Sequence, residues 1–127
     1  MRVRLRASDV SSVARHATAA RRAALGVVAE NALADTEPYV PYETGALVGS
    51  GTAEVGASGD RATLSYGGDA DTARYARPQY FEPHDHSTAA NAAHSPRATD
   101  HWCEASAREN GDRWRAMLAE GIERGLS

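Results

Sequence analysis

The sequence contains no lysine and a single cysteine, Cys103, among its 127 residues. One cysteine excludes a disulfide within the chain and a zinc site built from several cysteines. No run of about 18 apolar residues occurs, so no membrane-spanning helix is predicted. The opening residues, MRVRLR, lack the apolar stretch of a secretory signal, and we expect none.

Large apolar residues are also scarce. Hydrophobic residues make up 42% of the chain, but 26 of them are alanine, and Leu, Ile, Val and Phe together number only 17. The formal net charge of −3 is too small to indicate disorder, and the apolar residues follow a pattern. We therefore expect a folded chain with a thin hydrophobic core, which association with other subunits would supplement.

Charge is unevenly distributed, and all 14 basic residues are arginine. Residues 1–29 hold six arginines and one aspartate, a balance of +5, whereas residues 30–127 hold eight arginines and 16 acidic residues, a balance of −8. Three interpretations of the basic end stay open. It forms a solvated helix face, it binds nucleic acid, or it meets the acidic body of a neighbouring copy.

The first half of the chain predicts a strand, a long helix and a hairpin. Strict alternation predicts a strand over residues 2–6. Small and apolar residues three and four positions apart predict a helix over about residues 10–35. Residues 46–56 and 61–67 are predicted to pair as a β-hairpin around a turn at residues 57–60.

Two details refine that prediction. Residues 38–45 contain two prolines and a glycine, which favour an ordered, extended loop before the hairpin. Val55, Leu64 and Tyr66 would supply the buried face of the hairpin.

The second half predicts mainly helix and loop. A short helix is expected over residues 72–80 and a loop over residues 81–98. A last helix would open at residues 95–96 or 99–100 and run to Arg124, with Gly125 as its C-cap. The Asn-Gly pair at positions 110 and 111 is a possible interruption of this helix.

A group of histidines is the most conspicuous feature with chemical potential. Such residues bind zinc when their spacing is right, but the spacings here match no standard zinc module. We favour solvated loop histidines and keep a pH-sensitive contact as an alternative. The residues concerned are His84, Asp85, His86, His94, His101 and Cys103.

No catalytic motif is recognisable, so we do not expect an enzyme. Asp100, His101 and Ser106 lie near one another in sequence, but nearness in sequence is not the geometry of a catalytic triad. The carboxylates Glu43 and Glu82 would form an acidic pair only if the fold brought them together. No phosphate-binding glycine loop or dinucleotide-binding fingerprint is present.

Tyrosine is the commonest aromatic residue, with five copies. A tyrosine has a large apolar ring and a polar tip, which suits both the edge of a thin core and a subunit contact. Both interpretations stay open at this point. The five are Tyr39, Tyr42, Tyr66, Tyr75 and Tyr80.

Three segments resemble a known family when they are taken in order. Residues 39–47 read YVPYETGAL and residues 75–80 read YARPQY, with the predicted long helix before them and the hairpin between them. A C-terminal helix then carries Trp102, Glu104, Asn110 and Trp114. The set is similar to small morphogenesis proteins of tailed phages, described as minor capsid, head–tail joining or tail-completion proteins. The resemblance covers roughly residues 20–118.

The resemblance implies an α+β fold, with a long N-terminal helix and a C-terminal helix packed on a small antiparallel β-sheet, in one domain over residues 1–127. It implies a structural virion protein at the head–tail interface, assembled in the cytoplasm of a bacterial host. Copies would form a ring, commonly a hexamer, between portal complex and tail. DNA would pass through its lumen without sequence-specific binding, and neither a membrane partner nor a cofactor is implied.

We expect the assembly surface on residues that belong to these segments or lie among the tyrosines. Such a surface needs no catalysis, because its work is geometric. The alternative functions are a small metal-binding protein that uses the His84–His101 region and a nucleic-acid-binding protein that uses the basic N-terminus. The expected assembly residues are Tyr39, Val40, Pro41, Tyr42, Thr44, Gly45, Leu47, Tyr75, Tyr80 and Trp102.

Overall fold

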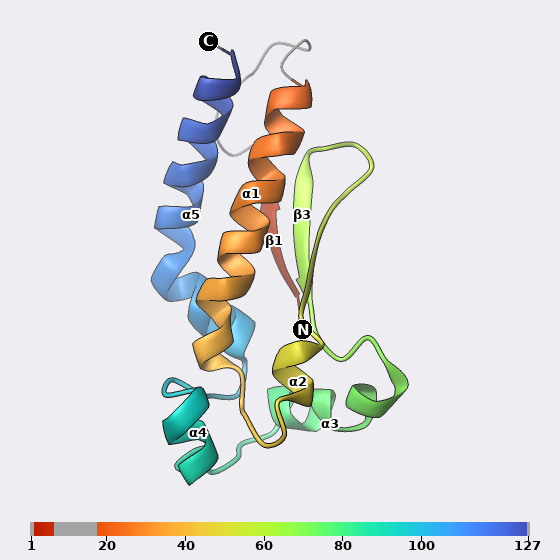
Figure 1. Ribbon diagram of the computed structural model, residues 1–127, viewed down its shortest axis with the longest axis vertical. Coiled ribbons are helices and arrows are strands. Elements are labelled where there is room, and N and C mark those ends of the chain that lie inside the picture. The colour runs from red at the N-terminus through yellow and green to blue at the C-terminus, as the bar shows by residue number, and fades with distance from the viewer. Residues whose placement is uncertain (1, 7–17, 127) are drawn as a thin grey trace.

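The computed structural model describes residues 2–6 and 18–126 and has an α+β fold (Figure 1). Two long helices, α1 and α5, lie side by side and cover one face of a small antiparallel sheet. The shorter helices gather at one end of this assembly. The elements in order are β1 (Arg2–Arg6), α1 (Thr18–Thr36), η3 (Glu37–Tyr39), α2 (Ala46–Gly49), β2 (Thr52–Val55), β3 (Arg61–Ser65), α3 (Ala70–Phe81), α4 (Ala89–His94) and α5 (Trp102–Leu126).

The sheet has the strand order β1-β3-β2, with both pairs antiparallel. Val3 is opposite Leu64, and Ala53 is opposite Leu64 on the other side. Ala62 and Leu64 are buried against the helices, while the alternate position Arg61 is exposed. This alternation is the pattern of an antiparallel sheet with one face on the core and the other toward solvent.

The first core lies between α1, α5 and the sheet. Leu25 and Val28 of α1 meet Trp114 and Leu118 of α5 there, and all four side chains are buried. The helices approach closely because small residues face each other. A Cβ built on Gly125 would lie only 2.6 Å from the Cβ of Ala20, so glycine is needed at this crossing.

The second core lies at the end that carries the short helices, and Val3 and Leu33 pack against both cores. Trp102 is fully buried at the centre of this core. The rings of Tyr80 and Tyr66 meet it edge-on, with distances between ring centroids of 4.7 Å and 5.8 Å. Such edge-to-face contacts are favourable between aromatic rings. The buried members are Tyr39, Val40, Leu47, Tyr66, Ala76, Tyr80, Trp102 and Cys103.

Several predicted elements are confirmed. The strand over residues 2–6, the turn at residues 57–60 and the burial of Leu64 and Tyr66 are present, although Val55 is only partly buried. The long first helix ends at Thr36, slightly beyond the expected position, and its predicted beginning lies outside the described residues. None of the described helices is both long and apolar enough to cross a membrane.

Other boundaries were wrong. Residues 46–49 form a helical turn and not a strand, because Gly45 turns the backbone and Ser50 N–H bonds back to Ala46. The paired part of the hairpin is correspondingly short, since β2 covers only Thr52–Val55. The glycines and serine at positions 49–51 have little tendency to form strands.

The segment over residues 81–98 is not wholly loop, since it contains α4. Thr88 begins this helix by accepting a hydrogen bond from Asn91 N–H, a capping pattern that sequence reasoning overlooked. The last helix begins at Trp102, runs through the Asn-Gly pair without a break, and continues past Gly125 to Leu126. Gly125 is therefore part of α5 and not its C-cap.

We predict that Asp35→Ala destabilises the fold far more than Asp112→Ala. Asp35 on α1 accepts hydrogen bonds from the indole N–H of Trp114 at 2.8 Å and from Arg113 at 2.6 Å. Its loss leaves the Trp114 N–H without an acceptor and should lower the free energy of unfolding by about 2 kcal/mol. Urea denaturation monitored by tryptophan fluorescence measures this.

Asp112→Ala is the matched control. Asp112 also pairs with an arginine, Arg115, but within one exposed turn of α5, where an ion pair contributes little. Equal losses of stability in the two variants would contradict the role given to the Asp35–Trp114 hydrogen bond.

Candidate functional site

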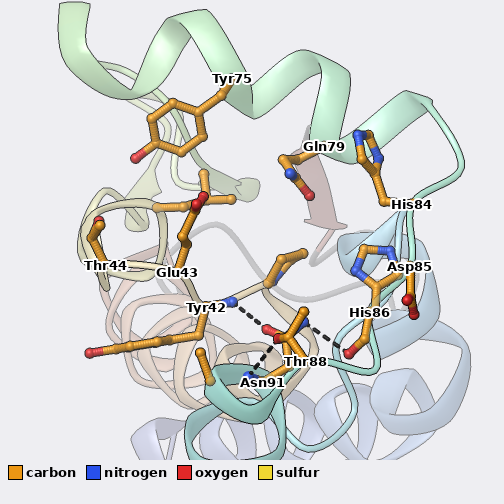
Figure 2. Close-up of a pocket in the computed structure, with 13 residues that line it drawn as sticks. Tyr42, Glu43, Thr44, Tyr75, Gln79, His84, Asp85, His86, Thr88 and Asn91 are labelled. Atoms are coloured by element: carbon orange, nitrogen blue, oxygen red, sulfur yellow. Dashed lines mark hydrogen bonds between the residues drawn. The ribbon is translucent and has the colours of Figure 1, made fainter.

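A pocket of about 510 Å³ opens at the end of the molecule that carries the short helices (Figure 2). Its walls come from the segment over residues 41–47, from α3, and from the segment over residues 84–91. In Figure 2, Tyr75 and Gln79 descend from α3 and Glu43 rises toward them. The histidines His84 and His86 stand at the other side of the pocket.

The segment over residues 41–47 is held in place by its own turn and by α4. Gly45 has a φ of +85° and stands immediately before α2, where the chain reverses into the helical turn. The ring of Tyr42 stacks on His94 with centroids 4.1 Å apart. The two-proline segment thus presents a fixed wall.

Asn91 connects two walls of the pocket. Its side chain is buried, accepts a hydrogen bond from Tyr42 N–H at 2.7 Å and donates one to the His86 carbonyl at 3.0 Å. Its own N–H bonds to Thr88, which begins α4. A single amide therefore couples the proline-rich segment to the histidine segment.

Among the residues that the structure describes, the lining carries negative charge and no arginine. Glu43 is exposed, and among the described residues it has no hydrogen-bond or ion-pair partner. Asp85 at the rim accepts two hydrogen bonds from Ser87, which lower the pKa of the Asp85 carboxyl. Nε2 of His86 is buried with no hydrogen-bond partner within the described part of the chain.

Of the ten expected assembly residues, some are buried in the second core and others line the pocket. Tyr39, Val40, Tyr80 and Trp102 are interior residues of the second core. Leu47 belongs to this core and also lines the pocket. Another four line the pocket, namely Pro41, Tyr42, Thr44 and Tyr75. Gly45 shapes the turn between them.

Tyr39 belongs to a polar cluster outside the pocket. Its hydroxyl donates to Glu109 and accepts a hydrogen bond from Arg97 at 2.7 Å, and Arg97 pairs with Glu109 at 2.7 Å. Burial, followed by the Glu109 hydrogen bond, raises the pKa of Tyr39. The Tyr39 hydrogen bond, with that of Arg97, lowers the pKa of Glu109. The cluster fastens η3 to α5 and explains why this tyrosine is structural.

The fold does not bring the candidate histidines and Cys103 together at one site. Within the described ranges, no three His, Cys, Asp or Glu side chains are grouped so as to hold a metal ion. Only His84, Asp85 and His86 line the pocket, while Cys103 is fully buried in the second core. Burial raises the pKa of the Cys103 thiol to about 12, which makes it a poor ligand and nucleophile.

The candidate catalytic residues also make separate contacts, and the two candidate acidic residues do not share the pocket. The hydroxyl of Ser106 is buried and hydrogen-bonded to Thr36 at 2.8 Å. His101 Nδ1 lies 3.5 Å from a Glu104 oxygen. Glu43 lines the pocket, whereas Glu82 does not.

Sequence reasoning missed Gln79, Thr88 and Asn91 as residues of this site. A threonine three positions before an asparagine within a stretch rich in alanine was a usable signal for a capped helix at residues 88–94. Nothing in the sequence indicates that Asn91 points back to Tyr42, since 49 positions separate the two.

Comparison of the chain with protein-family models, curated proteins and solved structures finds no match.

We predict that substitution by alanine lowers stability at Gly45 but not at Gly49. A Cβ on Gly45 would lie 2.9 Å from the Tyr42 hydroxyl oxygen, and its φ of +85° disfavours any other residue. Gly45→Ala should therefore lower the free energy of unfolding by about 1–2 kcal/mol. Gly49→Ala meets nothing within 4 Å and lies in α2, so it should be neutral or stabilising. Chemical denaturation of both variants tests this, and a stability cost of equal size would contradict it.

We also predict that Cys103 reacts with a thiol reagent only when the protein unfolds. At pH 8 the buried thiol is protonated and inaccessible. Labelling in native buffer should be about 100-fold slower than in denaturant. Rapid labelling of the native protein, timed by absorbance, would show that the second core opens readily.

Proposed function

We propose that this chain is a structural virion protein of a tailed bacteriophage that works at the joint between head and tail. In this proposal copies form a closed ring between the portal complex and the tail, and the ring completes the neck of the particle. The partners are other copies and the neighbouring connector and tail proteins. DNA passes through the lumen without sequence-specific binding. Assembly takes place in the cytoplasm of the bacterial host.

The convergence of the three resembling segments in one core is the observation that carries the proposal. Residues 39–47, the aromatic segment at residues 75–80 and the start of α5 are far apart in the sequence. They meet around Trp102, where Tyr39, Leu47 and Tyr80 are buried together. Residues that resemble a family in order, and also build one structural unit, support the resemblance more strongly than separate matches.

The α+β architecture also agrees with what the resemblance implies. Beyond the core, the same segments leave exposed or half-exposed groups around the pocket, including Tyr42, Thr44 and Tyr75. Aromatic side chains on a rigid support are typical of protein interfaces. This end of the molecule is therefore our choice for the assembly surface.

Particle assembly tests the function directly. We expect that phage lacking this chain accumulates DNA-filled heads and separate tails, because heads and tails cannot join. Thr44→Arg should reproduce the defect while the chain stays soluble and folded, since Thr44 is exposed at the pocket rim and the substitution adds bulk and charge. Electron microscopy of lysates and plaque counts measure both results.

Thr52→Arg is the matched control, because Thr52 is also exposed but lies on β2, away from the pocket. It should leave particle joining intact. Joined, infectious particles in the absence of the chain would refute the proposed function. Native mass spectrometry of the purified chain adds a test of the ring, and joining that survives Thr44→Arg would refute only the choice of surface.

A further inference from the structure

The pocket contains a carboxylate, that of Glu43, which has no partner among the residues that the structure describes. Glu43 projects into the pocket from the segment over residues 41–47 (Figure 2) and has no opposite charge beside it within the described residues. Asp85 adds a second acidic group at the rim. The lining is thus suited to a cationic group that comes from outside.

Some arginines elsewhere have no partner within the described part of the chain. Most of the described arginines pair with a carboxylate or bond to a carbonyl, as Arg97 and Arg113 do. Arg2, Arg74 and Arg108 are exposed and form no ion pair within the described ranges. Since the chain has no lysine, any cation that one copy offers to another from a side chain, histidine aside, is a guanidinium.

The remaining walls suit a guanidinium. Tyr75 and Gln79 extend from α3 into the pocket (Figure 2), and so an aromatic ring and an amide line the same pocket as the Glu43 carboxylate. Nε2 of His86 is a further polar atom, and it has no hydrogen-bond partner in the described ranges. Guanidinium groups stack on aromatic rings and donate several hydrogen bonds in a plane, which matches this set.

We propose that the pocket binds an arginine side chain of a second copy of this chain, with Glu43 as its counter-ion. The arginine is Arg2, Arg74 or Arg108, whose side chains have no ion pair, hydrogen bond or ring contact within the described residues, whereas Arg77 lies over the ring of Phe81 and Arg21 and Arg22 bond to carbonyl oxygens. A contact between a pocket on one copy and a different surface on the next is heterologous and closes into a ring when its rotation permits. The inference rests on the proposed function for the ring, but the pairing itself is measured on the purified chain.

Charge complementarity favours a second copy as the occupant. One chain carries both the Glu43 carboxylate and guanidinium groups that have no partner among its described residues, so head-to-tail association pairs both in every subunit. A metal ion is a weaker choice, because no three ligand side chains are grouped among the described residues. A peptide from another virion protein is an outcome that the experiment distinguishes.

Charge exchange on the full chain tests the pairing. Glu43→Arg should weaken self-association about tenfold or more, measured by sedimentation velocity over a concentration series, because it places like charges together. Each of Arg2→Glu, Arg74→Glu and Arg108→Glu is then combined with Glu43→Arg. One of the three combinations should restore association, and high salt should weaken the wild-type complex.

Glu82→Arg is the matched control, since Glu82 is an exposed glutamate at the same end that does not line the pocket. It should leave association unchanged. The inference is overturned if the wild-type chain does not associate, if Glu43→Arg and Glu82→Arg behave alike, or if no combination restores association. If Glu43→Arg blocks particle joining without changing self-association, the occupant is another virion protein, which also overturns it.

These outcomes separate the two proposals. If no combination restores association but particles still need the chain to join heads to tails, the arginine pairing is refuted and the proposed function stands. If one combination restores association but particles form without the chain, the proposed function is refuted and the arginine pairing stands.

Discussion

The fold depends on two buried tryptophan side chains of one helix, because the chain has few other large apolar side chains. Trp114 and Trp102 are both fully buried and lie about three turns apart on α5. Trp114 completes the core between α1, α5 and the sheet, while Trp102 anchors the core under the short helices. Residues of β1, α1, η3, α2, β2, β3 and α3 belong to one of these two cores or pack against it, so α5 connects most of the described elements.

The pocket is a consequence of the second core. Trp102 and Tyr80 fix the start of α5 against α3, and His101 N–H bonds to the Tyr80 carbonyl at 2.9 Å. Tyr39 and Leu47 hold both ends of the proline-containing segment in the same core. Val40 is buried in this core as well, whereas residues 41–44 stay at its surface and form a wall of the pocket. A thin core and a well-defined surface pocket are therefore two results of the same packing.

The charged side chains also divide into those that pair within the fold and those that lie at the pocket. Two ion pairs connect elements within the fold, one between Asp35 and Arg113 and one between Arg97 and Glu109. The carboxylate of Glu43 is left at the pocket, and this supports an intermolecular role for the charge. Histidine side chains in the lining add polar atoms but no metal-binding group within the described residues. The acidic and aromatic side chains of the lining suit the binding of another molecule.

Local sequence was sufficient where a residue's neighbours along the chain decide its state. Periodic alanine and valine determined the long first helix, alternation determined β1, and Gly59 with Asp60 marked the hairpin turn. It failed where distant residues decide. Whether residues 46–49 turn or extend depends on Gly45 and on burial of Leu47 against α3 and Trp102, and the partner of Asn91 lies 49 positions away. Sequence alone therefore determined the fold class and named several residues of the site. Only the tertiary structure decided which of these face the interior and which face the pocket, because burial depends on contacts that no local pattern records.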